Sequence, residues 1–238
     1  MRHSILSVAG LCLLVGCSDQ PRSDGAAADS IAAPTGVGGL PDSAFVAVPG
    51  ERIGVITAAT TEADLVATFG QAAIRRDEIG IGEGQTEWGT RLFPDTPDQL
   101  DILWAGSFAC PKHVSSSRVG GRWHTVEGVR VGSPLPEVEQ ANGKRFTLLG
   151  FEWDYGGYVS TFNQGKLDGL GLRFGLTEAV QTSVSKDELR GILGDRTLSS
   201  ADSVVRKAQP IVTELSMAWP AESAPCPKAA PADTQPAR

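Results

Sequence analysis

The stretch GFEWDYGGYVSTFNQGKL, residues 150–167, is the most distinctive of the sequence, because it combines five aromatic side chains, two carboxylates and a double glycine. Phe151, Trp153 and Tyr155 alternate with the carboxylates, and a period of two indicates a β-strand. After Gly156-Gly157 the aromatic positions change parity, as they do across a two-residue hairpin turn. The stretch therefore predicts an antiparallel hairpin within a sheet.

This hairpin predicts that the aromatic side chains share one face of the sheet and that Glu152 and Asp154 lie on the other. The predicted cross-strand pairs are Tyr155 with Tyr158, Trp153 with Ser160, and Phe151 with Phe162. A β-bulge at the glycines predicts the same change of parity. Two interpretations of the aromatic face stay open: it is buried core, or it is a concave surface on which Trp153, Tyr155 and Tyr158 anchor a protein partner.

The first half of the chain predicts a capped helix followed by an antiparallel meander. In GVITAATTEADLVATFG, residues 54–70, Thr60 or Thr61 is the expected helix cap, and Gly70 is a helix stop. Thr61 and Asp64 have the spacing of a capping box. The glycine-rich GIGEGQTEWG, residues 80–89, lacks the Lys-Ser/Thr of a phosphate-binding loop and indicates a hairpin.

The second half repeats this order. In GVRVGSPLPEVEQANG, residues 128–143, Ser133 is the expected helix cap, and Pro134 occupies the first helical position. Alternating residues and glycine turns follow the helix, which again predicts a meander.

The end of the chain predicts one more helix and one more strand. SKDELRGILGD begins with the cap Ser185 and ends at the glycine stop Gly194, and PIVTELSMAW, residues 210–219, is a closing strand. The predicted fold class is α+β, with two tandem helix-plus-antiparallel-meander repeats. In its fullest form the prediction places both repeats in one curved antiparallel sheet.

The second repeat resembles the small outer-membrane lipoproteins of the BamE (SmpA/OmlA) family, and the tandem arrangement is similar to the repeats of the β-lactamase-inhibitor protein. The matching positions are Gly132, Ser133, Val138, Gly143, Trp153, Asp154, Tyr155 and Gly165. The chain departs from the family pattern in carrying two copies and in lacking a proline soon after Gly143. The resemblance implies a small noncatalytic module that binds protein partners.

The N-terminal segment MRHSILSVAGLCLLVGC resembles the export signal and lipobox of bacterial lipoproteins. It has a basic Arg2, an apolar core too short to span a bilayer, and a cysteine at position 17. The resemblance implies cleavage before Cys17, lipidation of its thiol and stable anchoring by several acyl chains. Ser18 after the cysteine implies an outer-membrane location facing the periplasm. The alternative is an ordinary cleaved signal with an incidental cysteine.

The predicted organisation follows from these segments. The ranges are 1–16 for the signal peptide, 17–43 for the lipidated cysteine and a flexible tether, 44–110 for the first repeat, 111–180 for the second repeat, 181–220 for the closing helix and strand, and 221–238 for a C-terminal tail.

Of the four cysteines, Cys12 would be removed with the signal peptide and Cys17 would carry the lipid, so two remain in the mature chain. In an oxidising compartment an even remainder predicts a disulfide, between Cys110 and Cys226. One alternative is a pair of free thiols. The other is a zinc site in which Cys110 and His113 form one ligand pair and Cys226 and His124 the other, although this spacing matches no standard zinc motif.

Charge and composition argue against several classes of function. The formal charge of −7 argues against a nucleic-acid partner, which requires clustered Lys and Arg. Glu152 and Asp154 are a weak acid–base candidate, because no nucleophile accompanies them. Asp95, Asp98 and Asp101 are a weak calcium candidate without the spacing of an EF-hand. We therefore expect no enzyme activity, no cofactor and no bound metal.

The function expected from the sequence is that of a cell-envelope lipoprotein whose partner is another envelope protein, as an assembly accessory or as an inhibitor. In this interpretation the membrane is contacted through the N-terminal lipid alone. The alternative is a lipoprotein of the periplasmic face that binds a small ligand or a metal between the repeats.

Overall fold

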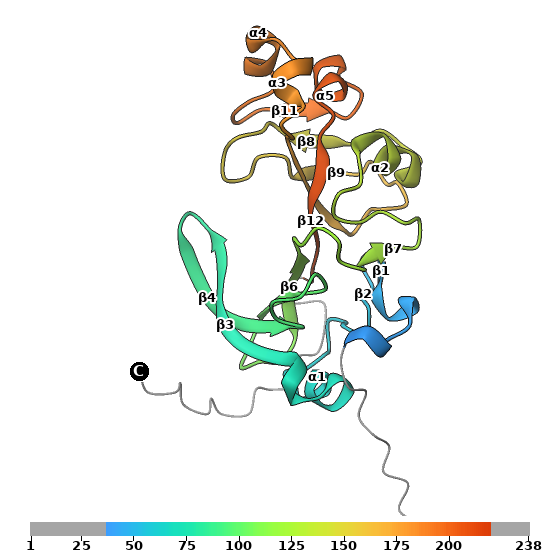
Figure 1. Ribbon diagram of the computed structural model, residues 1–238, viewed down its shortest axis with the longest axis vertical. Helices are drawn as coiled ribbons and strands as arrows, with labels where there is room; N and C mark the ends of the chain where they lie inside the picture. The colour runs from blue at the N-terminus through green and yellow to red at the C-terminus, as the bar shows by residue number, and fades with distance from the viewer. Residues whose placement is uncertain (1–36, 220–238) are drawn as a thin grey trace, which may run out of the picture. The chain divides into compact units, whose positions relative to one another are not determined.

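The computed structural model describes residues 37–219, which all belong to one compact unit (Figure 1). The predicted signal peptide, Cys17, most of the predicted tether and Cys226 lie outside the described residues. Helices and strands are both present, and the fold class is α+β, as predicted. The strands form three sheets in the described part of the chain.

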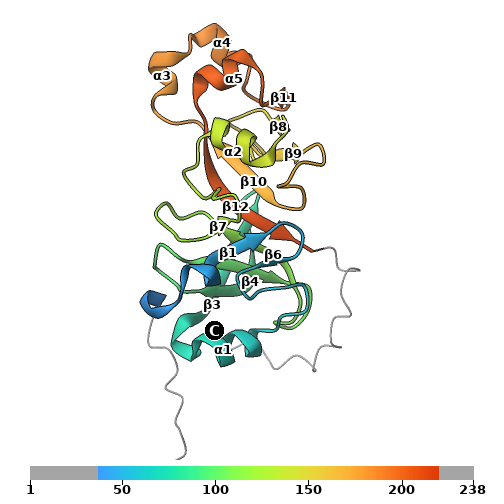
Figure 2. The same ribbon diagram turned by 90° about the vertical axis from the view of Figure 1, so that its right-hand side faces the viewer.

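The largest sheet has six antiparallel strands in the order β10-β12-β6-β5-β4-β3. Its strands are β3 (Ile74–Gly82), β4 (Gln85–Leu92), β5 (Leu100–Trp104), β6 (Pro111–Ser116), β10 (Gly171–Gly175) and β12 (Ile211–Ala218). The closing strand predicted from the sequence is confirmed as β12. It lies between β6 and β10, and therefore joins strands from the two halves of the chain (Figure 2).

The described part of the chain also contains two small, three-stranded sheets. The first contains β1 (Val46–Val48), β2 (Arg52–Ile53) and β7 (His124–Thr125), and the second contains β8 (Thr147–Leu149), β9 (Val159–Thr161) and β11 (Thr197–Ser199). A bridge between Tyr158 and Arg173 links the second small sheet to β10. Next to it, the Phe174 amide donates to the Gly157 carbonyl at 2.8 Å. The polypeptide at Gly157 thus runs directly against the large sheet.

Short helices complete the described structure. They are α1 (Glu62–Phe69), α2 (Leu135–Asn142), α3 (Val180–Ser183), α4 (Lys186–Arg190), α5 (Ser203–Ala208) and the 3-10 segments η1 (Val37–Gly39), η2 (Asp42–Phe45) and η3 (Gln71–Ala73). The capping box of α1 is confirmed: the Thr61 hydroxyl accepts from the Asp64 amide at 3.2 Å, and the Asp64 carboxylate accepts from the Thr61 amide at 2.8 Å. Gly70 ends this helix as predicted.

Two helix-end predictions need correction. Helix α2 begins at Leu135 after Pro134, and the Ser133 hydroxyl accepts from the Arg130 amide, so Ser133 is not the cap. Proline at the cap position preorganises the first turn by its fixed φ without a side-chain bond. Helix α4 has the predicted Ser185 cap but ends at Arg190, one turn before the expected stop.

A cluster of three phenylalanines lies within the hydrophobic core. Phe146 stacks on Phe174 with ring centroids 5.7 Å apart, and it contacts Phe162 at the same distance. All three side chains are at most 2% exposed. Burial of such large apolar side chains is the main favourable term for this part of the fold.

The predicted two-residue hairpin at Gly156-Gly157 is wrong. The hairpin is formed by β8 and β9, and residues 150–158 are its connection. Glu152 has φ +63, a left-handed conformation that interrupts any strand passing through it. The Trp153 indole then donates to the Gly150 carbonyl at 2.8 Å, which closes the connection on itself. We call residues 150–158 the aromatic connection.

Candidate functional site

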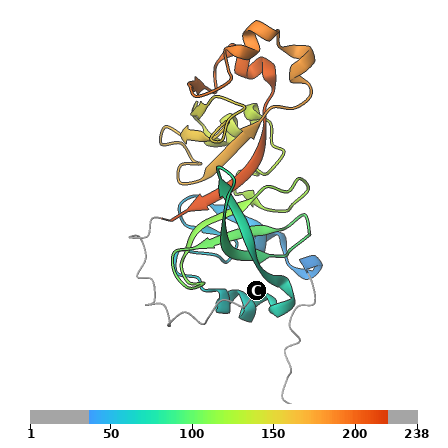
Figure 3. The same ribbon diagram turned by 90° about the vertical axis from the view of Figure 1, so that its left-hand side faces the viewer.

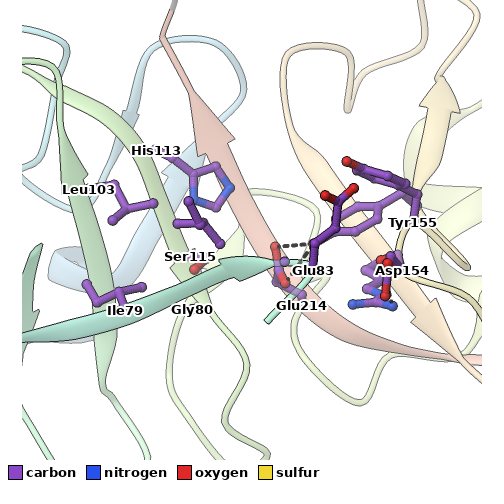
Figure 4. A pocket seen from close by; sticks show the side chains of 13 residues that line it. Ile79, Gly80, Glu83, Leu103, His113, Ser115, Asp154, Tyr155 and Glu214 are labelled. Carbon is purple, nitrogen blue, oxygen red and sulfur yellow. Dashed lines mark hydrogen bonds between the residues drawn. The ribbon is translucent and has the colours of Figure 1, made fainter. Parts of the chain in front are cut away.

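A pocket of about 330 Å³ opens between the aromatic connection, the tip of the β3–β4 hairpin and one face of the six-stranded sheet (Figure 4). The sheet contributes Leu103, His113, Ser115, Arg173 and Glu214 to its lining. These five side chains come from the four strands β5, β6, β10 and β12, so the completed sheet is needed to assemble the pocket floor.

Strand alternation explains the position of the β6 side chains. Val114 and Ser116 are almost fully buried in the core, and the residues between them, His113 and Ser115, point to the opposite face. Burial lowers the pKa of His113, and the positive charge of Lys112 acts in the same direction, while Glu214 opposes the shift. The environment of His113 therefore favours its neutral imidazole.

A bulge in β12 directs Glu214 into the pocket. Arg173 pairs with Glu214 and Phe174 pairs with Val212, which leaves Thr213 as the extra residue. Val212 and Leu215 can consequently both face the core, while Glu214 points away from it.

Glu214 binds the phenol of Tyr158. The Tyr158 hydroxyl donates to the two carboxylate oxygens at 3.2 and 3.0 Å. Burial raises the pKa of Tyr158 to about 12, and the negative charge of Glu214 adds to the shift. On the other side of the ring, the Arg173 guanidinium carbon lies 5.0 Å from the Tyr158 ring centroid, a cation–π distance. These contacts hold Tyr158 in place as part of the pocket wall.

The opposite wall is a projecting two-stranded arm, residues 77–89 (Figures 1 and 3). Strand β4 pairs with β5 only over residues 90–92, so beyond that point β3 and β4 have each other as partners. At the tip Glu83 and Gly84 have φ of +51 and +71, the conformation of a type I′ turn, and the predicted hairpin is confirmed. Ile79 is 4% exposed and fits over Gly89, where a Cβ would collide with it.

The structure separates the three predicted partner-binding residues from the other aromatics of the stretch. Tyr155 and Tyr158 line the pocket, whereas Trp153 lies beside it and contacts the Tyr155 ring edge-on at a centroid distance of 5.4 Å. Phe151 and Phe162 are each 2% exposed and belong to the core. The prediction that all the aromatics share one sheet face is therefore wrong.

The predicted carboxylate pair is also separated. Glu152 and Asp154 are both exposed, and Asp154 lines the pocket while Glu152 does not. They share no sheet face, because the chain turns between them instead of running as a strand.

The aspartates considered for calcium are each engaged by an arginine. The ion pairs are Arg75–Asp95 at 2.5 Å, Arg122–Asp98 at 2.8 Å and Arg91–Asp101 at 3.4 Å. Their carboxylates therefore do not converge on one point. Within residues 37–219, no group of three His, Cys, Asp or Glu residues is placed to hold a metal ion.

The predicted disulfide has one partner in the described part of the chain. Cys110 is 4% exposed and has φ +57 in the connection before β6. Its proposed partner Cys226 lies outside the described residues, so the pairing stays a prediction, as does the zinc alternative at the same cysteine. His124, the other candidate ligand, has Nδ1 at 2.7 Å from the Arg122 carbonyl oxygen.

The residues that form the floor of the pocket were not predicted from the sequence. His113, Arg173 and Glu214 are far apart in the sequence and meet only through the strand order β10-β12-β6. The one local signal was the polar Glu214 within the alternating pattern of the predicted closing strand.

Comparison with known proteins returns no significant match to a protein-family model, a curated protein or a solved structure. Across residues 37–219, no helix has both the length and the apolar character needed to cross a membrane.

Proposed function

We propose that this chain is a cell-envelope lipoprotein, anchored through Cys17, that acts as a noncatalytic protein-binding module. Its task would be that of an assembly accessory or an inhibitor, as the resemblance to the BamE family and to the β-lactamase-inhibitor-protein repeat implies. The proposal includes two tandem repeats that share the six-stranded sheet. The position of β12 between β6 and β10 supports that part.

The observation that carries the proposal is the exposed Tyr155 at the rim of the pocket. Its side chain is 52% exposed, although it is held by an edge-on contact with Trp153. A large, preorganised aromatic side chain at the edge of a hollow is the typical anchor of a protein interface. Ile81, 46% exposed on the arm, offers an apolar contact on the opposite rim.

The state of the Tyr158 phenol argues against a catalytic role for this one side chain. The Tyr158 phenol, with its pKa raised to about 12, stays protonated at neutral pH and donates to Glu214. A phenol held in this way is a poor nucleophile and a poor general base.

In-cell photo-crosslinking tests the proposal. A photoreactive phenylalanine derivative, which keeps an aromatic ring at the anchor position, is placed at Tyr155 of the full chain. A matched chain carries it at Val126, a 70% exposed site that does not line the pocket. We expect a discrete protein adduct from position 155 and none from position 126. No adduct at 155, or the same adducts at both positions, would contradict the proposal.

The size of the pocket favours a second candidate, a small-ligand-binding lipoprotein. A volume of about 330 Å³ lies at the lower end of the range of small-ligand pockets, roughly 300–1,000 Å³. Native mass spectrometry of the full chain purified from its own cells separates the candidates. A bound small molecule of constant mass would favour this one, and an unliganded mass would oppose it.

A further inference from the structure

The lining of the pocket carries an excess of negative charge. It includes the carboxylates of Glu83, Asp154 and Glu214, and the single guanidinium of Arg173. For His113, the remaining titratable base of the lining, burial lowers the pKa and favours the neutral imidazole. Three negative charges against one positive charge leave the pocket with a net charge of about −2.

The one cation of the pocket is already engaged. The Arg173 guanidinium donates to the carbonyl oxygen of Gly156 at 2.8 Å and to that of Asp154 at 3.2 Å. It also lies over the Tyr158 ring. Arg173 is therefore directed to the backbone of the aromatic connection, where it holds the pocket wall, and not to the carboxylates at the rim.

Two carboxylates at the rim are available to a ligand. Glu83 lies at the tip of the arm and Asp154 lies on the aromatic connection, so they approach the pocket from its two walls (Figure 4). Within residues 37–219, no hydrogen bond or ion pair joins either carboxylate to another residue. By contrast, Asp77 and Glu87 of the same arm are paired with Arg91 and Lys112.

Aromatic surface lies beside these carboxylates. Tyr155 is 52% exposed and shares the lining with Glu83 and Asp154. An aromatic ring attracts a cation to its face, and a guanidinium both stacks on such a ring and binds carboxylates through its planar fork of N–H donors. The combination selects a planar cation over an apolar group or an anion.

From this arrangement, and resting on the proposed function, we propose that the pocket receives an arginine side chain of the partner protein. The guanidinium stacks on Tyr155 and donates to the carboxylates of Glu83 and Asp154. The pocket volume of about 330 Å³ is ample for one such side chain, while the surrounding rim contacts the rest of the partner. The partner therefore presents an exposed arginine at the centre of its contact surface.

The test uses N-acetyl-arginine amide as the probe and N-acetyl-citrulline amide as its uncharged isostere, both titrated by NMR into the purified full chain at low salt. We expect the arginine probe to bind and the citrulline probe not to bind. In the double variant Glu83→Gln/Asp154→Asn, the affinity for the arginine probe should fall about fivefold to tenfold, because two exposed charge interactions are removed. The control Glu127→Gln/Asp168→Asn, which neutralises two exposed carboxylates that do not line the pocket, should bind as the wild type does.

Three results would each overturn the inference: no binding of the arginine probe, equal binding of the citrulline probe, or unchanged affinity in the double variant of the rim. The proposed function fails separately, when position 155 captures no more protein in cells than position 126 does. A Glu83→Gln/Asp154→Asn chain that still yields the full adduct from position 155 would leave the proposed function in place and reject the arginine.

Discussion

The phenylalanines and the other aromatic residues of 150–167 differ in their exposure to solvent, although they are interleaved in the sequence. Phe151 and Phe162 are buried in the core, whereas Trp153 is partly exposed and Tyr155 is more than half exposed. A phenyl ring has no polar atom to satisfy, but an indole or a phenol has a hydrogen-bonding group that favours an interface with solvent or a partner. Indoles are not excluded from the core, since Trp104 and Trp123 are at most 5% exposed. Within residues 150–167, however, the alternating spacing did not tell the core side chains from the exposed ones.

The largest loss of stability is expected in the buried phenylalanine cluster to which Phe162 belongs. Phe146→Ala removes the ring that contacts both Phe162 and Phe174, and it should lower the free energy of unfolding by about 3–5 kcal/mol. Urea unfolding followed by circular dichroism measures this loss. A loss below about 1 kcal/mol would mean that the phenylalanine cluster contributes little to the stability of the core.

The next effect concerns the glycine that brings the aromatic connection against the large sheet. Gly157 has φ +78, and a Cβ there would collide with the Phe174 carbonyl, so Gly157→Ala should cost about 2–4 kcal/mol of unfolding free energy.

Gly84 provides the matched control for this substitution. It has a similar φ of +71, but a Cβ at this position would meet no atom within 4 Å, so Gly84→Ala should cost only about 1 kcal/mol. Equal losses in the two variants would show that φ alone, and not the close approach to β10, explains the role of Gly157.

Tyr158 is intermediate in exposure between the buried phenylalanines and the exposed Tyr155. Tyr158→Phe removes the hydrogen bond to Glu214 and should lower the unfolding free energy by about 0.5–1.5 kcal/mol at neutral pH. Since the pKa of Tyr158 is raised to about 12 from its ordinary value of 10, its contribution is present below pH 10 and is lost as the pH rises from 10 towards 12. The difference in stability between the wild type and the variant should therefore shrink over that range.

Ultraviolet absorbance provides a direct measurement, because the chain contains only two tyrosines. In a Tyr155→Phe chain the phenolate absorbance comes from Tyr158 alone, and its midpoint should lie near 12 in the folded protein. A midpoint near 10 would contradict the burial and the hydrogen bond described for Tyr158.

The smallest effect on stability is expected at Tyr155, the most exposed aromatic residue of the stretch. Tyr155→Ala should change the unfolding free energy by no more than about 0.5 kcal/mol, because more than half of the side chain is already in contact with solvent. The same substitution should abolish partner capture from a photoreactive residue placed at Ile81. A large loss of stability would make Tyr155 a structural residue and remove the main support for the proposed contact surface.

Local chemistry in the sequence was enough to predict several elements. The pair Thr61 and Asp64 predicted the start of α1, the glycine-rich tip predicted the β3–β4 hairpin, and residues 210–219 predicted β12. Each of these signals depends on neighbouring residues, whose backbone preferences act before any tertiary contact forms.

The remaining features depended on contacts between distant residues. The period-two pattern around Trp153 predicted a strand, but the left-handed Glu152 and the bond from Trp153 to the Gly150 carbonyl turn the chain there. Likewise, no local pattern places Arg173 opposite Glu214, since their pairing requires β12 to insert beside β10. Two of the three predicted partner-binding residues, Tyr155 and Tyr158, line the pocket. The charged floor of the pocket could not be predicted, because its residues come from strands that are far apart in the sequence.

The central position of β12 has a consequence for the order of events during synthesis. Ser216 pairs with Ser115, about one hundred residues earlier in the chain, and β12 is the last strand of the described structure to leave the ribosome. Until then, β6 and β10 have no shared neighbour, and each leaves an open strand edge to which other chains could add. Contacts this distant in sequence form slowly, so these two strand edges stay open until late in folding.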